Sequence, residues 1–325
     1  MCKKHEIVIG DIGGTNARFC LARLDASGVI TLGQQVNIKV HDYLTFADAF
    51  RAYRTQIGPR LPKQAAIAIA SPIKGTTIKL TNNAWIIDQA ALKQELALEA
   101  ITFVNDFGAV GHSLAQLAPQ DYSHLAGPEQ PLPDNGVITV LGPGTGLGVA
   151  HVLRTDGRAY VMESEGGHIS FAPTDAFEDA LLARTRRKFG RVSAERLIAG
   201  PGILEIYALL AAQAGQSEIF QNDTELWQAG LSKTDPLAAA AIHRFCLLFG
   251  SVAGDLALAH GAQAVVVAGG IVPRLVEHLA MDGFSERFTA KGRFTTLLNA
   301  IPVKLIVHPD PGLLGAAIVG SATIG

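Results

Sequence analysis

The sequence predicts an α/β fold of two domains that repeat one another. Residues 7–19 and 140–149 each run from an apolar segment, through a glycine-dense turn containing Gly-Thr, into more apolar residues. Strand-like and helix-like segments alternate after both stretches, as they do in α/β proteins. The chain has 325 residues, which is enough for two domains with separate cores.

The first half of the chain shows three strands, a helix and a buried strand, in that order. Residues 6–12 and 17–24 alternate around a Gly-rich turn and predict an antiparallel pair. A buried strand at 101–104 ends directly at Asn105-Asp106. The other expected elements are a third strand at 31–40, a helix at 43–57, a strand at 65–70, a small hairpin at 73–80, a helix at 89–98 capped by Asp88, and a helix at 107–117.

The second half repeats the three strands and then inserts helices. A stretch rich in proline, residues 118–136, indicates a crossing between domains. We expect a small domain made of residues 1–117 and 309–325, and a large domain made of residues 118–308. The expected elements are strands at 137–141, 148–153, 160–163, 264–268 and 301–308, and helices at 175–189, 194–197, 203–214, 223–227, 236–260 and 312–320.

Composition and charge describe a globular chain whose expected partners are small molecules or another copy of itself. Hydrophobic residues make up 48% and charged residues 17%, and the formal net charge is -2, so nothing favours nucleic acid or an anionic membrane as a partner. The longest apolar stretch, residues 237–272, is broken by charged residues and glycines, which argues against a membrane span. The polar start lacks the apolar core of a signal peptide, so we expect a cytoplasmic protein. The cysteines lack metal or redox spacing and are expected to be reduced thiols: Cys2, Cys20 and Cys246.

The two glycine turns are candidates for binding phosphate. Glycine lets bare backbone N–H groups approach an anion, and two such turns can hold a phosphate chain from opposite sides. In the first turn, Asp11 stands beside Gly13 and Gly14, where Mg²⁺ with its preference for oxygen ligands can bridge to phosphate. The alternative is a tight hairpin in which Asp and Gly serve only the turn geometry. The matching Gly144-Thr145-Gly146 favours phosphate.

Polar residues elsewhere have one functional and one structural interpretation each. Asn105-Asp106 caps a helix, or places a carboxylate where it accepts a proton from an attacking hydroxyl, as the catalytic Asp of kinases does. Glu165 and His168 flank a flexible glycine pair and suit the hydroxyls of a polyol, although a satisfied structural histidine remains an alternative. From composition alone, Glu195 is a carboxylate favoured by a helix start.

A second glycine pair, Gly269-Gly270, follows a short apolar strand. It lets an adenine lie close to the backbone, or it serves only the packing of a helix against a strand. One histidine and one glutamate are too few for a zinc site, and neither the Rossmann nor the Walker A pattern occurs.

Taken together, these stretches resemble the bacterial glucokinases of the hexokinase and actin-type ATPase superfamily. The resemblance covers nearly the whole chain and implies two ribonuclease-H-like α/β domains, each with a mixed sheet flanked by helices, and a cleft between them. The cysteine-rich zinc motif of the related repressor/kinase group is missing, which places the chain in the zinc-free branch. The stretches that carry the resemblance are residues 10–18, 81–85, 105–107, 142–151, 165–168, 192–196, 268–273 and 311–315.

The resemblance also implies an activity and roles for individual residues. The expected reaction is ATP-dependent phosphorylation of glucose at its 6-hydroxyl, with ATP, Mg²⁺ and glucose as ligands and Asp106 as general base. The family further implies a homodimer. Glucose contacts are implied for Asn105, Asp106, Glu165, His168 and Glu195. ATP contacts are implied for Gly10, Asp11, Ile12, Gly13, Gly14, Thr15, Gly144, Thr145, Gly269 and Gly270.

Three other functions compete with this expectation. A kinase for another hexose, such as mannose or fructose, differs only in hydroxyl contacts that spacing does not reveal. A sugar-binding regulator without catalysis would require a DNA-binding segment, and no basic helix precedes the first strand. An actin-like filament protein leaves the cluster of Glu and His residues unexplained.

Overall fold

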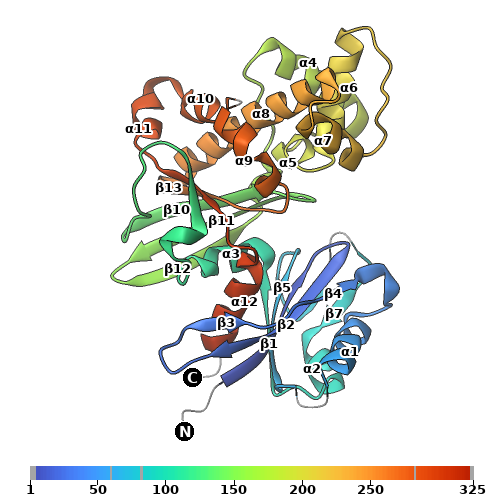
Figure 1. The fold of residues 1–325 in the computed structure, drawn as a ribbon, viewed down its shortest axis with the longest axis vertical. Helices are drawn as coiled ribbons and strands as arrows, with labels where there is room; N and C mark the ends of the chain where they lie inside the picture. Colours follow the sequence, from blue (N-terminus) through green and yellow to red (C-terminus); the bar gives the residue numbers. More distant parts are fainter. Residues whose placement is uncertain (1–4, 59–60, 81–82, 282, 323–325) are drawn as a thin grey trace. The chain divides into compact units, whose positions relative to one another are not determined.

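The computed structural model describes residues 5–58, 61–80, 83–281 and 283–322, and the chain forms two compact units (Figure 1). Unit 1 contains Met1–Ala118 and His308–Gly325, and unit 2 contains Pro119–Val307. Each unit is built on a mixed sheet with helices packed against it, which confirms the predicted α/β class.

Unit 1 is organised around a mixed sheet whose strand order is β3-β2-β1-β5-β8, with β4 also paired to β2. Strands β1 and β2 are antiparallel, whereas β1, β5 and β8 are parallel. A separate two-stranded sheet joins β6 and β7. The strands are β1 (His5–Ile12), β2 (Asn16–Leu24), β3 (Ile30–Leu32), β4 (Val36–Lys39), β5 (Gln64–Ile69), β6 (Thr77–Lys79), β7 (Ile86–Asp88) and β8 (Ala100–Asn105).

Both faces of this sheet are buried, which explains the continuous apolar run of its central strand. Successive side chains of a strand point to opposite faces, so Val8 packs with the cluster of helix α1 and Ile9 with that of helix α12. Phe19 stacks on Tyr53 of α1, with 5.3 Å between ring centroids. Figure 1 shows α1 and α12 on opposite sides of β1. The helices of unit 1 are η1 (Val40–Asp42), α1 (Phe46–Ile57), α2 (Gln89–Glu95), α3 (Asp106–Ser113) and α12 (Pro311–Ala322).

Two expectations for unit 1 are wrong in detail. The third strand is interrupted at Gly33, whose N–H donates to the carbonyl of Leu21, and its two parts pair with different stretches of β2. The expected hairpin around Lys74-Gly75 does not form, because β6 pairs with the later strand β7, with Ile78 opposite Ile87. Thr81 and Asn82, which belong to one of the recognised stretches, lie outside the described residues.

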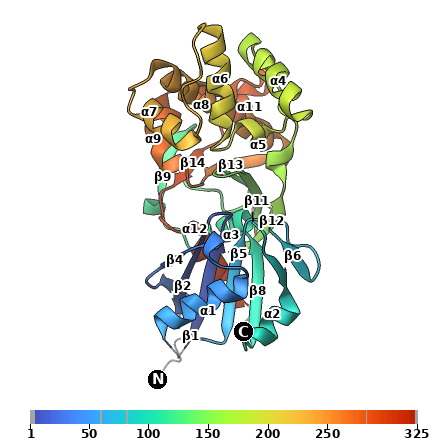
Figure 2. The ribbon, with the colours of Figure 1, turned by 90° about the vertical axis from the view of Figure 1, so that its right-hand side faces the viewer.

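Unit 2 repeats the strand plan of unit 1. Strands β10, β11 and β12 form an antiparallel meander, and β13 and β14 then add in parallel beyond β10. Figure 2 shows β13 and β14 beneath the helices of unit 2. Strand β9 closes the far edge and arises from the stretch that was expected only to cross between domains. The strands are β9 (Tyr122–Ala126), β10 (Gly136–Pro143), β11 (Leu147–Thr155), β12 (Arg158–Ser164), β13 (Ala262–Val267) and β14 (Val303–Ile306).

Helices inserted after β12 form most of the remainder of unit 2. Three of their starts are capped by side chains: Asp175, Ser193 and Asp235 each accept a hydrogen bond from the N–H three residues ahead. Three helices after β13 were not predicted, namely α9, α10 and α11. The helices are η2 (Pro119–Asp121), η3 (Gly166–His168), α4 (Ala176–Phe189), α5 (Ala194–Leu197), α6 (Gly202–Gln213), α7 (Asp223–Leu231), α8 (Pro236–His260), α9 (Val272–Met281), α10 (Phe284–Thr289), η4 (Gly292–Phe294) and α11 (Thr295–Asn299).

Helix α8 is the central helix of the unit 2 core. Its Phe245 meets Trp227 edge to face, and its Phe249 does the same with Phe284. By length and composition alone, α8 could cross a membrane, despite the interruptions seen in the sequence. However, 72% of its apolar window is buried inside the structure, as in the core helix of a soluble protein, so the resemblance to a membrane span is weak evidence.

The two described cysteines, Cys20 and Cys246, are fully buried. Burial raises the pKa of the Cys20 thiol to about 12, and the nearby Asp310 carboxylate adds to this effect. The Cys20 thiol therefore stays neutral and acts as a small apolar group of the core.

Candidate functional site

The polar residues predicted in unit 1 gather at one edge of its sheet. Strands β1, β5 and β8 are parallel and in register, with Ile12 beside Ile69 and Ile69 beside Asn105. The carboxyl ends of these strands therefore meet, and neighbouring strands lie about 4.8 Å apart. Ligands of α/β sheets collect outside such ends.

The first glycine turn joins β1 to β2 at this edge. The N–H of Gly13 donates to the carbonyl of Asn16 at 3.0 Å, and Thr15 is exposed at the turn. A Cβ on Gly13 would make only an ordinary contact, 3.6 Å from Asn16 O. At Gly10, in contrast, a Cβ would lie 3.0 Å from the Phe19 ring, so packing within the sheet already favours glycine there.

Asp11 lies in an ion-pair network that pattern reasoning did not find. Its carboxylate pairs with the Arg18 guanidinium, which also approaches Asp310 at 3.5 Å. Asp310 also accepts a hydrogen bond from the Gln35 side chain. A Cβ on Gly312, in the first turn of α12, would lie 3.2 Å from Asp11 Oδ2. A usable signal was present, because Asp310 stands between the last strand and the last helix.

Asn105 and Asp106 mark the passage from β8 into α3. The Asn105 side chain accepts from the N–H groups of Phe107 and Gly108, both at 3.0 Å, so the helix-cap interpretation is correct for this residue. Its amide Nδ2 is directed at the Ser71 carbonyl, 3.5 Å away. Asp106 is partly exposed in the first turn of α3, where the helix dipole favours a carboxylate.

The second glycine turn joins β10 to β11 in unit 2. The N–H of Gly144 donates to Gly146 O, and the Gly144 carbonyl accepts from the N–H of Gly200, both at 2.8 Å. A Cβ on Gly144 would meet nothing within 4 Å, whereas a Cβ on Gly142 would fall 1.5 Å from Ala268 O. Glycine at 142 is required by close packing of strands, but glycine at 144 leaves open space above the backbone.

The predicted sugar ligands of unit 2 converge beside this turn. His168 Nδ1 lies 3.7 Å from Glu195 Oε1, and His168 Nε2 lies 3.8 Å from Glu165 Oε2. All three side chains are partly exposed, the most covered being Glu195 with 32% exposure. The cluster thus presents two carboxylates and one imidazole to solvent from η3 and α5.

Glu195 is directed away from its own helix start. Its Oε2 accepts from the N–H of Leu147 at 3.0 Å, and a Cβ on Gly146 would lie 2.5 Å from the same oxygen. The carboxylate is therefore held against the second glycine turn, whereas Ser193 caps α5. A role at the helix start alone does not account for this placement.

The glycine pair between Glu165 and His168 is not a flexible hinge, contrary to expectation. Gly167 is buried, and a Cβ there would fall 2.1 Å from Leu147 O. The pair instead lets η3 approach β11 closely, which fixes the two side chains that it carries.

Gly269 and Gly270 follow β13 next to the second turn. Gly269 has a φ of +113°, and a Cβ on it would lie 2.5 Å from Pro143 O, so the backbone requires glycine. A Cβ on Gly270 would meet nothing within 4 Å. Gly269 thus serves packing, whereas Gly270 leaves open space beside the backbone, and the adenine contact stays a prediction.

Comparison with known proteins identifies the family. The glucokinase family model matches residues 8–323. The chain belongs to the glucokinase family. A glucokinase from Zymomonas mobilis is 50% identical over 312 residues, covering 96% of both chains. A glucokinase from Xanthomonas oryzae is 36% identical over 315 residues, covering 96% of this chain and 93% of its own.

Solved glucokinase structures share the fold. One from an Antarctic psychrotroph has a TM-score of 0.83 and 32% identity, covering 98% of this chain and 99% of its own. A ROK-family glucokinase from Streptomyces griseus, solved with glucose and AMPPNP, has a TM-score of 0.66 and 15% identity, and the match covers 98% of this chain and 100% of its own. At this identity, the likeness shows the fold alone. The predicted actin-type ATPase fold class is confirmed.

The donor set around Asp11 fits a magnesium ion only with help from a ligand. Within the described ranges, no group of three or more His, Cys, Asp or Glu side chains is placed to hold a metal ion. Mg²⁺ in phosphate-binding sites commonly takes one or two carboxylates and completes its shell with phosphate oxygens and water. Asp11, partly exposed with 15% of its side chain accessible, matches this pattern.

Two half-buried histidines of unit 2 were not singled out from the sequence. The rings of His151 and His260 lie 4.4 Å apart, and His260 Nδ1 lies 2.9 Å from Thr139 Oγ1. His151 Nδ1 is buried without a hydrogen-bond partner among the described residues. Burial lowers the pKa of both imidazoles, and for His260 the neighbouring His151 adds to the effect.

Proposed function

We propose that this chain transfers the γ-phosphoryl group of ATP to the 6-hydroxyl of glucose, giving glucose 6-phosphate and ADP. Membership of the glucokinase family over almost the whole chain supports this activity. It disfavours a sugar-binding regulator without catalysis. Kinases for mannose or fructose remain the alternative that an assay must separate.

The observation that carries the proposal is the cluster of Glu165, His168 and Glu195 beside the second glycine turn. Carboxylate oxygens accept hydrogen bonds from two hydroxyls at once, and a neutral imidazole both donates and accepts. The anchoring of Glu195 by the Leu147 N–H and the packing of η3 on β11 fix these groups in advance, which lowers the entropy cost of holding a sugar. The cluster therefore suits a polyol such as glucose.

The two glycine turns are the proposed phosphate contacts. Neither Gly13 nor Gly144 is packed tightly against other atoms, so each leaves room above its backbone for a ligand. Mg²⁺ would be held by Asp11 together with phosphate oxygens and water, and it would neutralise charge on the transferring phosphoryl group. Gly270, open and next to the second turn, is the proposed neighbour of the adenosine.

Asp106 is the proposed general base, and Asn105 a sugar contact. Phosphoryl transfer depends mainly on positioning and charge, and a carboxylate accepts the hydroxyl proton as the new P–O bond forms. Asn105 Oδ1 is engaged by two backbone N–H groups, so we propose that its amide Nδ2, which also donates to the Ser71 carbonyl at 3.5 Å, provides the sugar contact. Asn105 also orders the first turn of α3, on which Asp106 stands.

The proposal extends to the setting of the enzyme. We infer that it works in the cytoplasm, with Mg²⁺, as a homodimer that feeds glucose 6-phosphate into glycolysis. A net charge of -2 favours neither nucleic acid nor an anionic membrane as a partner. Sedimentation of the purified chain tests the dimer independently of the activity.

A coupled assay of ADP release tests the function directly. Glucose, mannose and fructose are compared at equal concentrations, with and without Mg²⁺, and polyphosphate replaces ATP in a parallel series. We expect the highest kcat/KM with glucose, ATP and Mg²⁺ together. A higher kcat/KM with mannose or fructose would assign the enzyme to that sugar, and the absence of turnover with every hexose would overturn the proposal.

A further inference from the structure

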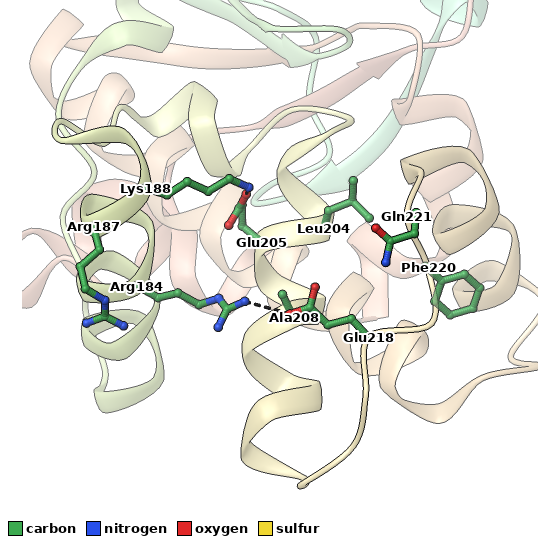
Figure 3. A pocket seen from close by; sticks show the side chains of 9 residues that line it. All are labelled: Arg184, Arg187, Lys188, Leu204, Glu205, Ala208, Glu218, Phe220 and Gln221. Carbon is green, nitrogen blue, oxygen red and sulfur yellow. Dashed lines mark hydrogen bonds and ion pairs between the residues drawn. The ribbon is translucent and has the colours of Figure 1, made fainter.

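Unit 2 contains a cavity that is separate from the glycine turns and from the Glu/His cluster. This cavity has the features of an anion site. It has a volume of about 490 Å³ and lies between α4, α6 and the segment leading to α7 (Figure 3). This volume falls within the range of about 300–1,000 Å³ that small-molecule sites occupy. The cavity shares no residue with the groups proposed above for glucose or ATP.

One wall of the cavity is a basic face of α4. Arg184, Arg187 and Lys188 all line it, and residues three and four apart stand on the same face of a helix. Figure 3 shows Arg184 and Lys188 reaching from α4 toward α6 and the following segment. Arg186 belongs to the same turn of α4 but does not line the cavity.

The positive charge of this wall is only partly compensated. Lys188 Nζ pairs with Glu205 at 2.5 Å, where the Glu205 side chain is 12% exposed and the Lys188 side chain is 61% exposed. Arg184 pairs with Glu218 at 2.9 Å, but Glu218 is 45% exposed and such pairs are weak. No hydrogen bond or ion pair joins Arg187 to any other residue that the structure describes.

The opposite wall adds an apolar surface. Leu204 and Ala208 of α6 and the Phe220 ring line the cavity. Phe220 is itself held edge to face against Tyr207, with 5.3 Å between centroids. A ligand that satisfies both walls carries a compact anion at one end and a small apolar body at the other.

We propose that this cavity binds a phosphate monoester with a small apolar body. The phosphate oxygens take the guanidinium groups of Arg187 and Arg184, whose planar forks match phosphate, and Glu218 is displaced from Arg184. The apolar body lies against Leu204 and Phe220. The proposal goes beyond the proposed function, since the site is separate from the sugar and ATP residues and needs neither ligand.

Titration calorimetry of the full chain with phenyl phosphate tests the site, with no ATP or glucose present. We expect one binding event, weakened about tenfold in Arg187→Ala through loss of a charge-assisted contact, and tightened about twofold to fivefold in Glu218→Gln. The matched control is Arg186→Ala, which removes the same charge from the same turn and should leave the affinity unchanged. Arg186 and Arg187 are both exposed, so neither variant threatens the fold.

Three results would overturn the proposal. The first is no binding at millimolar phenyl phosphate, and the second is an equal loss of affinity in the Arg186 and Arg187 variants. The third is displacement of phenyl phosphate by glucose or AMPPNP, which would place it in the sites proposed for the reaction. Inorganic phosphate tests the apolar wall, because it lacks the phenyl group. If inorganic phosphate bound as tightly as phenyl phosphate, Leu204 and Phe220 would have no role in binding.

Discussion

The two glycine turns occupy equivalent places in the repeated sheets, yet polar groups reach them by different routes. In each unit one strand pair closes the turn, Ile12 with Ala17 in unit 1 and Pro143 with Leu147 in unit 2. The next pair along the strands is Asp11 with Arg18 in unit 1 and Gly142 with Gly148 in unit 2. Unit 1 thus carries an ion pair on the strands themselves.

In unit 2, the acidic group comes from outside the repeat. Glu195 stands on α5, inserted after the meander, and reaches the turn through the N–H of Leu147. The shared sheet thus supplies both turns, but the charged groups beside them stand on the strands in unit 1 and on an inserted helix in unit 2. We therefore expect variants of unit 1 to affect turnover most and variants of the unit 2 cluster to affect sugar binding.

Replacing Asp106 by Asn is the strongest test of this division. The amide cannot accept the hydroxyl proton, so we expect kcat to fall about 10²–10⁴-fold while the affinity for glucose is largely kept. Single-turnover kinetics and glucose titration measure the two effects separately. Asp134→Asn, at an exposed position of unit 2, is the control. Near-normal turnover of the Asp106 variant would remove Asp106 from the reaction.

Alanine at 142 and at 144 separates a glycine needed by the fold from one proposed to face a ligand. The Cβ of Gly142→Ala would fall 1.5 Å from Ala268 O, so we expect a loss of stability of about 1–3 kcal/mol or more. Gly144→Ala meets open space, so we expect little change in Tm but a several-fold higher KM for ATP. Thermal melts and ATP kinetics of both variants give the comparison. If Gly144→Ala left the KM for ATP unchanged, the second turn would be only a hairpin.

Glu195→Gln tests the group that unit 2 brings in from α5. The Gln side-chain oxygen still accepts from the Leu147 N–H, so we expect the Tm to be nearly unchanged. Loss of the charge weakens the hydrogen bonds to sugar hydroxyls, and we expect the KM for glucose to rise about tenfold with a smaller change in kcat. An unchanged KM for glucose would leave Glu195 with a structural role only.

Local chemistry accounts for the parts of the fold and site that the sequence predicts. Caps such as Asp88 and Asp175 depend on a single side chain and a few N–H groups, and α8 shows its long apolar pattern directly. The family resemblance implied that Glu195 and His168 both contact glucose, but their approach to each other was not predicted, because it joins separate elements. Asp310 was missed for the same reason: its partner Arg18 lies 292 residues away in the chain.

Missed elements have a related cause. Strand β9 lies in a stretch rich in turn-forming residues, and only its pairing with β14 makes it a strand. Helix α10 has six residues and is stabilised by Phe284 and Phe288 packing on α8, where a Cβ on Gly250 would lie 2.2 Å from Phe284 O. Such short elements are specified by tertiary contacts, and intrinsic propensity does not reveal them.

The smallest expected effect concerns a further difference between the repeats. Farther along the same strands, Thr139 pairs with His151 in unit 2. At the same distance from the pair that closes the turn, Val8 pairs with Leu21 in unit 1. Burial lowers the pKa of His151 and His260 from the usual 6.5, so the folded state disfavours their charged forms. For His260, this outweighs the position at the end of α8, where the helix dipole favours a cation.

The sign of the pH effect follows from these lowered values. Above about pH 6.5 both histidines are neutral in the folded and unfolded states, and as the pH falls below it the unfolded chain binds more protons, so stability decreases. When the pH is lowered from about 7 to about 5.5, we expect the Tm of His151→Leu to fall less than the Tm of the wild type. The difference between the two falls should be about 2–4 °C. Leu21→Met, at the equivalent position of unit 1, should keep the wild-type dependence. Equal pH dependence of Tm in the wild type and His151→Leu would show that this half-buried pair does not set the acid sensitivity of unit 2.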